Sequence, residues 1–290
     1  VPIETNLGEE NPYLMGRIDG DLMYDIVMQW DWGNSERTDI YHDPETRKNS
    51  ISFRSNMARL AETLINENKN EKARNIIDLA MAKMPLDYFG YYSLLVPFVD
   101  GYFRIDDADK ALELSLKIAE KYRDRLNYFN SLDANSQYNM GEEIITEIER
   151  YRTLVEANLK HAEKTDLTPI LNQFIEAIEP FRYLYGDYEF YTGLVDVVEG
   201  YYIEDKILIA QSLSTKIGTE YEQRIQLFGQ VSAENQRQLL SRIQNELTEY
   251  NYFVQIVKAY DSSAFGNQIE SEFNKNLELF SPLLDEKEED

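Results

Sequence analysis

The chain has 290 residues, and its 53 acidic against 29 basic residues give a formal net charge of -24. This charge repels polyphosphate backbones and anionic lipid surfaces at long range, so no nucleic acid is expected as a partner. The sequence has no cysteine, which excludes disulfide frameworks, cysteine-bearing zinc sites and thiol nucleophiles. It also has no apolar run long enough to span a membrane.

Residues 1–50 are predicted to form a leader segment that packs on the helices after it or precedes them. Within it, Asp19-Gly20-Asp21 has the form in which many nucleotide-sugar transferases hold a divalent metal through carboxylate oxygens. No hydrophobic strand precedes this motif, and Asp21 stands where a helix over 22–28 needs an N-cap. The capping interpretation is therefore favoured over metal binding.

Residues 54–85 carry the tetratricopeptide pattern, in which small residues let two antiparallel helices approach closely and a proline ends the second helix. The residues in register with that pattern are Met57, Leu60, Ala61, Leu64, Ala73, Ile77, Ala80 and Pro85. A second, divergent pair follows from Leu95 to Ala111, and it loses the pattern at Ser115 and Arg123.

Helical spacing of apolar residues predicts the remaining elements, and strand-like alternation is absent. The expected helices cover residues 52–67, 71–84, 88–104, 108–130, 134–163, 168–181, 187–203, 206–229, 233–261 and 267–280, the last ending before Pro282. Asp133 and Ser232 each precede an alanine and are predicted to be N-caps of the long helices that follow them.

An internal repeat underlies this order of helices. Residues 92–155 align without a gap to 191–254 at an offset of 99, and about a third of the pairs are identical, which is typical of stacked repeats. We therefore predict an all-α, right-handed helical-repeat solenoid with tetratricopeptide-like pairs. Its first unit covers 51–165, its second unit and a capping helix cover 166–282, and residues 283–290 form an acidic tail.

The sequence contains few of the motifs that are typical of metal-binding or catalytic sites. His42 and His161 are the two histidines and are far apart, which excludes a multi-histidine metal site within one chain. Residues 106–109 contain three aspartates, but they lack the glycine and distant glutamate of a helix-loop-helix calcium site, so helix capping is favoured. Phosphate-binding loops and hydrolase motifs are missing as well. We expect no catalytic residue, no metal and no cofactor.

A ligand groove is predicted from the architecture. In tetratricopeptide arrays the first helices of successive pairs line a concave groove that suits an extended peptide. Tyr88 and Tyr91 belong to an aromatic run that could grip a peptide or stack on a sugar, or equally serve packing. The predicted binding residues are Ser55, Ala58, Glu62, Ile65, Tyr88, Tyr91, Asp100, Phe103 and Arg104.

The N-terminal third also carries a family resemblance. The run from Tyr13 to Asp25, followed by Trp32-Gly33, Tyr41, Phe53-Arg54 and Ala58 to Glu62, resembles the soluble C-terminal region of a Bacteroidota family of polytopic membrane proteins. The N-terminal half of those proteins is similar to protein O-mannosyltransferases of the GT-C type. The positions that match the family pattern, with no role known, are Arg17, Asp19, Asp21, Tyr24, Asp25, Trp32 and Gly33.

The resemblance implies a periplasmic domain tethered to a membrane-embedded, glycosyltransferase-like half that would hold the catalytic residues and is absent from this sequence. The expected function is a non-catalytic protein-interaction module that recruits or positions a protein or peptide partner. Two alternatives stay open, namely a helical domain that binds or processes sugars and a free-standing cytoplasmic tetratricopeptide adaptor.

Overall fold

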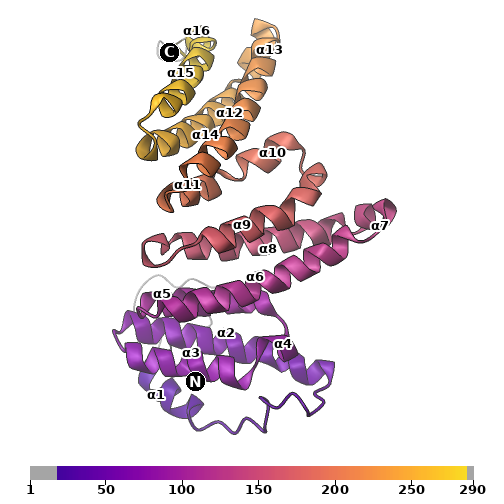
Figure 1. Cartoon of the computed structure of the whole chain (residues 1–290), viewed down its shortest axis with the longest axis vertical. Helices are drawn as coiled ribbons and strands as arrows, with labels where there is room; N and C mark the ends of the chain where they lie inside the picture. Colours follow the sequence, from indigo (N-terminus) through magenta and orange to yellow (C-terminus); the bar gives the residue numbers. More distant parts are fainter. Residues whose placement is uncertain (1–17, 286–290) are drawn as a thin grey trace. The chain divides into compact units, whose positions relative to one another are not determined.

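The computed structural model describes residues 18–285, and this part of the chain is all-helical, as predicted, with no strand among the described residues (Figure 1). It divides into two compact units. The first unit comprises residues 18–125 and 146–165, and the second comprises 126–145 and 166–285. One division point thus lies between Thr165 and Asp166, and the residues around the 131–133 turn belong with the second unit.

The first unit contains α1 (Gly20–Val27), α2 (Pro44–Asn66), α3 (Asn70–Lys83), α4 (Leu86–Phe89), the 3-10 helix η1 (Tyr92–Leu95), α5 (Val96–Arg104), the larger part of α6 (Ala108–Asn130), the C-terminal part of α8 (Gly141–Leu159) and η2 (Ala162–Lys164). The antiparallel pair α2 and α3 packs most closely, and α5 packs against both (Figure 1). All the apolar pattern residues of this pair, from Met57 to Ala80, are buried.

The second unit contains α7 (Ala134–Asn139), α9 (Thr168–Ile178), η3 (Glu179–Leu184), α10 (Asp187–Thr192), α11 (Val195–Ile203), α12 (Ile207–Gly229), α13 (Ala233–Gln238), α14 (Leu240–Tyr260), α15 (Ala264–Glu278) and α16 (Ser281–Asp285). Here α12 packs against α10, α11, α14 and α15. Pro282 lies in the first turn of α16, where proline is tolerated because the N–H it lacks has no partner inside a helix.

The leader prediction is wrong at its C-terminal end, because α2 begins at Pro44 and not near residue 52. Asp43 Oδ1 accepts the N–H groups of Glu45 at 2.9 Å and Thr46 at 3.1 Å, which makes Asp43 the N-cap of α2. An aspartate at the cap followed by proline at the first helical position is a strong helix start. Residues 44–50 therefore form the first two turns of α2.

Several helices predicted as continuous are interrupted, among them the expected helix over 187–203, which is divided into α10 and α11. The expected helix over 88–104 is divided into α4, η1 and α5, because Gly90 and Tyr91 have φ values of 66° and 48°, in the left-handed region. The expected helices over 134–163 and 233–261 are divided after Asn139 and Gln238. Asp133 and Ser232 are confirmed as N-caps, although each caps a short helix, α7 or α13, and not a long one.

The offset of 99 residues found in the sequence recurs in the element bounds. Helices α5, α6 and α7 begin at residues 96, 108 and 134, and α11, α12 and α13 begin at 195, 207 and 233. Asp106 and Asp205, with φ values of 59° and 55°, end α5 and α11 in the same left-handed conformation. Asp106 thus terminates a helix and does not cap the next one, while its neighbour Asp107 pairs with Arg74.

Buried contacts recur at the same offset. The rings of Tyr122 and Tyr151 stack 5.1 Å apart at 11°, and those of Tyr221 and Tyr250 stack 5.0 Å apart at 8°. Both pairs lie in the cores of their units. Because large aromatic side chains bury about 150–250 Å² each, these stacks add substantially to the cores of both units.

Arg54 is fully buried in the first unit and connects α2 to the turn between α3 and α5. Its Nη1 donates to the carbonyl of Gly90 at 2.5 Å and its Nη2 to that of Met84 at 2.8 Å. These two residues are the C-caps of α4 and α3, whose last carbonyls carry the negative end of a helix dipole. Burial lowers the pKa of Arg54 to about 10, so the side chain stays charged at neutral pH.

Replacing Arg54 with methionine is expected to lower the free energy of unfolding by about 3 kcal/mol, because two carbonyls lose charge-assisted donors within the fold. Denaturant unfolding followed by circular dichroism measures the change. Lys48→Met is the control, since Lys48 makes only an exposed ion pair with Glu45 and its loss should cost less than about 0.5 kcal/mol. Equal effects of the two substitutions would contradict the structural role of Arg54.

Candidate ligand groove of the first unit

A groove of about 370 Å³ lies between α2 and the segment formed by η1 and α5. Both sides are contributed by the first unit. The lining residues are Ser55, Ala58, Arg59, Ala61, Glu62 and Ile65 from α2, and Ser93, Leu94, Pro97, Asp100, Gly101 and Arg104 from η1 and α5. Six of the nine residues predicted from the sequence are therefore brought together here.

Helical spacing places these side chains on the groove. Ser55, Ala58, Glu62 and Ile65 are three or four residues apart and form one stripe of α2, while Met57, Leu60 and Leu64 face the core. Gly101 allows α5 to approach α3 closely, because a Cβ atom at this position would lie 2.9 Å from Cδ1 of Ile77. Small side chains line much of the groove and leave room for a ligand backbone.

Asp100 is held from behind the groove by His161. The Nε2 atom of His161 lies 2.9 Å from Oδ1 of Asp100, and the imidazole ring stacks on Phe103 with centroids 4.8 Å apart. An ionised carboxylate only accepts hydrogen bonds, so Nε2 is the donor. Arg104 lies 3.7 Å from Asp100 and donates to Oδ1 of Asn66 at 2.5 Å. The groove wall thus carries one acidic and one basic side chain, Asp100 and Arg104, and each is held in place by hydrogen bonding to a neighbour.

His161 was not predicted to contact a groove residue, although the internal repeat contains a signal for it. At the offset of 99 residues, Asp100 aligns with Glu199, Phe103 with Tyr202 and His161 with Tyr260. In the second unit, Tyr260 donates to Glu199 at 3.1 Å and stacks on Tyr202 with centroids 6.0 Å apart. The same arrangement of carboxylate, donor and stacked ring is therefore built twice from different residues.

Three predicted binding residues do not line the groove. Phe103 is fully buried under His161, so its assignment as a ligand contact is wrong. Tyr88 is half-buried, and its hydroxyl donates to the carbonyl of Ile40 at 2.5 Å and accepts the N–H of His42 at 2.7 Å. Tyr88 therefore holds the segment before α2 in place. Tyr91 is exposed but lies outside the groove lining, in a left-handed turn before η1.

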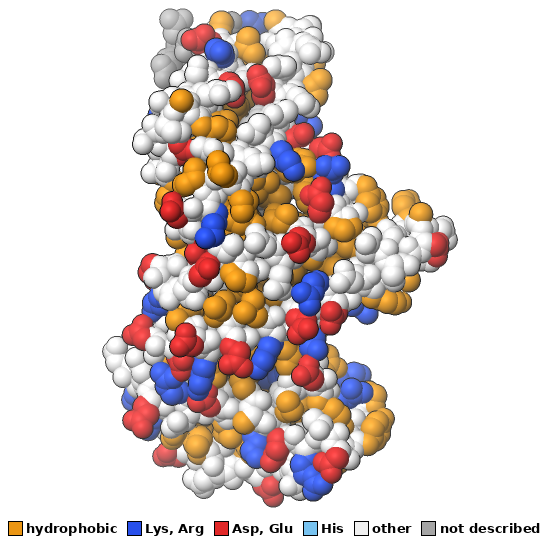
Figure 2. Space-filling view, viewed as in Figure 1, with side chains coloured by type: hydrophobic (Ala, Val, Ile, Leu, Met, Phe, Trp, Pro, Cys, Tyr) orange, Lys and Arg blue, Asp and Glu red, His pale blue; other side chains and the backbone are white. Residues whose placement is uncertain are grey.

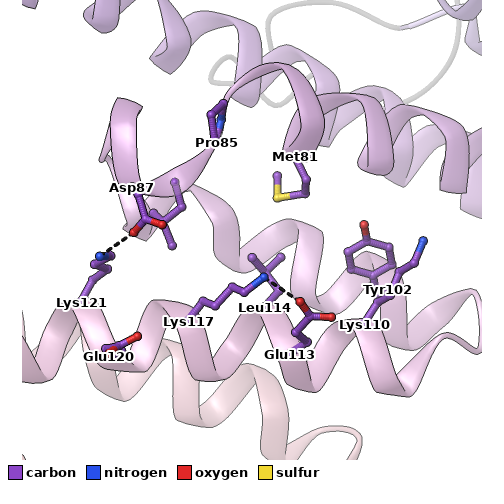
Figure 3. Close-up of a pocket in the computed structure, with 11 residues that line it drawn as sticks. Met81, Pro85, Asp87, Tyr102, Lys110, Glu113, Leu114, Lys117, Glu120 and Lys121 are labelled. Carbon is purple, nitrogen blue, oxygen red and sulfur yellow. Dashed lines mark hydrogen bonds and ion pairs between the residues drawn. The ribbon is translucent and has the colours of Figure 1, made fainter. Parts of the chain in front are cut away.

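A second cavity of the first unit, of about 420 Å³, lies between the end of α3, the Pro85–Asp87 turn and α6 (Figure 3). Its lysines all pair with carboxylates: Lys110 with Asp78 at 2.8 Å, Lys117 with Glu113 at 2.6 Å and Lys121 with Asp87 at 2.6 Å. Figure 3 shows Lys121 reaching across to Asp87, whereas Lys117 and Glu113 share α6. Because its lysine charges are matched, this cavity is the weaker candidate for a charged ligand.

Two of the residues that match the family pattern, Asp21 and Tyr24, hold α1 against α3 and the residue before it. Asp19 is the N-cap of α1 and accepts the N–H of Leu22 at 3.0 Å, so the prediction that Asp21 is the cap is wrong. Asp21 instead pairs with Lys69 at 2.7 Å and Lys72 at 2.6 Å. No group of three or more potential ligands that could hold a metal occurs between residues 18 and 285.

The remaining family-pattern residues have varied surroundings. The hydroxyl of Tyr24 accepts from Asn75 at 3.0 Å, and the ammonium of Lys72 lies 4.9 Å from the Tyr24 ring centre. Trp32 packs against Trp30 and Phe53 at centroid distances of 5.6 and 5.7 Å. Asp25 is exposed on α1, and Gly33 has a left-handed φ of 55°. Arg17 lies outside the described residues.

Comparison of the chain with protein-family models, with curated proteins and with solved structures found no match in any of the three. Among the helices of residues 18–285, none combines the length and the apolar character needed to cross a bilayer.

Acid should weaken the docking of α1. Hydrogen bonds from Lys69 and Lys72 lower the pKa of Asp21 from 3.8 to about 2. The stability contributed by this carboxylate is therefore present above about pH 4 and is lost as the pH falls through 2. Asp21→Asn should lower the melting temperature at pH 7 by a few degrees at most, with the difference from the wild type vanishing towards pH 2.

The matched control is Asp25→Asn, which removes an exposed carboxylate from the same helix. Thermal unfolding at pH 7 should show a smaller effect for this variant than for Asp21→Asn. A constant destabilisation by Asp21→Asn across the whole range would contradict the ion-pair explanation.

The repeated arrangement around Asp100 predicts which residue can replace His161. His161→Ala removes a donor and a stacked ring and should cost about 1–2 kcal/mol of unfolding free energy. His161→Tyr supplies the donor and ring used in the second unit and should recover most of that loss. Chemical unfolding compares the two variants, and equal destabilisation by both would show that the two arrangements are not equivalent.

Proposed function

We propose that this chain is a non-catalytic, tetratricopeptide-like helical-repeat module that binds an extended segment of a protein partner in the groove between α2 and α5. One observation supports this proposal. Residues predicted to lie on the first helices of two successive helix pairs line a single groove. We further propose that the helix pairs continue as a right-handed solenoid with tetratricopeptide-like units.

The lining chemistry supports an extended peptide. Such a peptide presents its own backbone N–H and C=O groups, which need partners along the groove. Ser55 and Ser93 offer hydroxyl groups from opposite sides, and Glu62 offers an exposed carboxylate. Ala58, Ile65 and Pro97 supply apolar contacts between them. The net charge of -24 attracts a basic partner at long range and raises its rate of association.

The resemblance of the N-terminal third supports a location for this activity. We propose that the module is the periplasmic C-terminal domain of a membrane protein with a glycosyltransferase-like half, and that it recruits or positions a protein partner for that half. A tagged full-length protein in its native cells should be digested by protease in spheroplasts but not in intact cells. Protection in both preparations would favour a cytoplasmic adaptor.

The groove itself is tested with a displayed library of random peptides selected on the purified chain. Ala58→Tyr should fill the groove and weaken the selected peptides at least tenfold, while the circular dichroism spectrum stays unchanged. Met81→Tyr introduces the same ring into the second cavity and is the matched control, with unchanged binding expected. Binding that is insensitive to Ala58→Tyr would refute the groove, as would a selection that yields no binding peptide.

A further inference from the structure

The hairpin end formed by residues 126–141 differs in composition from the rest of the chain. Charged residues make up 28% of the sequence, yet Asp133 is the one charged residue between Arg125 and Glu142. Its carboxylate is occupied as the N-cap of α7, where it accepts the N–H groups of Asn135 and Ser136 at 3.1 Å. The other polar residues are Asn127, Tyr128, Asn130, Ser131, Asn135, Ser136, Gln137, Tyr138 and Asn139.

Large aromatic side chains are exposed at this hairpin end. Tyr138 is 81% exposed and Tyr128 is 50% exposed. Tyr183 of η3, which is 57% exposed, donates its hydroxyl to Oε1 of Gln137 at 2.8 Å and so joins the same surface. In the space-filling view the α7 end of the hairpin is mostly white and orange, with little red or blue (Figure 2; compare α7 in Figure 1).

A second hairpin end, residues 225–240 around α13, shows what the fold itself requires. Its backbone elements lie at the same offset of 99 residues. Gln137 and Gln236 have the same role, each donating to the carbonyl seven residues before it, that of Asn130 at 3.3 Å and that of Gly229 at 3.4 Å. The N-caps Asp133 and Ser232 correspond as well. The interior of the turn is therefore retained in both copies.

The residues at exposed positions differ between the two hairpin ends. Tyr128 corresponds to Leu227, and Tyr138 corresponds to Arg237. Asn135 corresponds to Glu234. Since the second hairpin end folds with these other residues, the tyrosines and the lack of charge at residues 126–141 are not needed for the turn. Both tyrosines are nevertheless exposed.

This composition is that of a protein-binding surface. Interface cores are enriched in tyrosine and depleted in charged residues. Tyrosine offers a large contact area at low cost in side-chain entropy, while asparagine and serine supply adaptable hydrogen bonds. We propose that residues 126–141, together with Tyr183, form a self-association surface to which a second copy of this chain binds.

The lack of charge on this surface suits a second copy as its occupant. Two copies that each carry a net charge of -24 repel one another, so they can meet only where acidic groups do not face each other. In a two-fold contact the same patch lies on both sides, so a patch bearing one sign of charge would oppose itself. Amide and hydroxyl groups both donate and accept, which makes this uncharged patch complementary to itself. A basic partner, by contrast, would bind best at acidic surfaces.

The surface is small, so the association should be weak, with a dissociation constant of about 10–100 μM. Added salt should strengthen it, because screening reduces the repulsion between the two acidic chains without removing the neutral contacts. This inference goes beyond the groove, since the groove lies in the first unit and the proposed surface in the second.

Sedimentation equilibrium of the whole chain from about 5 μM to 500 μM tests the proposal, spanning the expected dissociation constant. The wild type should pass from monomer towards dimer, more completely at high salt. Tyr128→Leu with Tyr138→Arg introduces the residues of the second hairpin end, which that turn accommodates, and should weaken dimerisation at least tenfold. Tyr252→Arg, at an exposed tyrosine of α14, makes the same change in charge elsewhere and should dimerise like the wild type.

A wild type that stays monomeric at both salt concentrations would overturn the proposal, and so would a double variant that dimerises normally. Thermal unfolding of each variant establishes that a loss of dimer is not a loss of fold. Binding of some other protein by a strictly monomeric chain would also count against self-association. Peptide binding in the groove is measured separately with Ala58→Tyr, so failure of one proposal is distinguishable from failure of the other.

Discussion

The buried guanidinium of Arg54 is the constraint on which the geometry of the first unit depends. It extends from α2 to two carbonyls that belong to the ends of α3 and α4. Those ends flank the turn that leads into η1 and α5, so Arg54 fixes where the second side of the groove begins relative to the first. A buried cation without these acceptors would be costly, which makes the turn and the charge depend on each other.

The two copies of the repeat keep the same kind of side-chain contact even where the residues that make it differ. Glu147 accepts from Tyr92 at 2.8 Å, and its counterpart Glu246 accepts from Tyr188, three residues before the aligned Tyr191. The donor has moved by nearly one helical turn while the carboxylate has kept a tyrosine partner. Burial and hydrogen bonding raise the pKa of both donors, Tyr92 and Tyr188, so each stays a neutral donor. Both copies thus keep a partly buried carboxylate that accepts a hydrogen bond from a tyrosine.

Features that depend on residues close together in the sequence were predicted correctly, whereas features that depend on residues far apart in the sequence were not. The bounds of α6 were predicted correctly and those of α12 to within one residue, because long uninterrupted apolar periodicity is a local signal. The break at Gly90 and Tyr91 involves Arg54, more than thirty residues earlier, and no local pattern shows it. Likewise six groove residues followed from helical spacing, whereas Phe103 and Tyr88 were misassigned because their partners, His161 and Ile40, are remote in sequence.

Comparison of the copies also separates the groove residues that the fold requires from those free to serve a ligand. Asp100 keeps an acidic counterpart in Glu199, each with its donor and stacked ring, so its position is at least partly structural. Arg104 corresponds instead to Ile203, an exposed apolar residue at the end of α11. A cation at this position is therefore not needed to end the helix. Arg104 and the uncharged hairpin end share this property, since in both places the first copy carries residues that the second copy replaces with others.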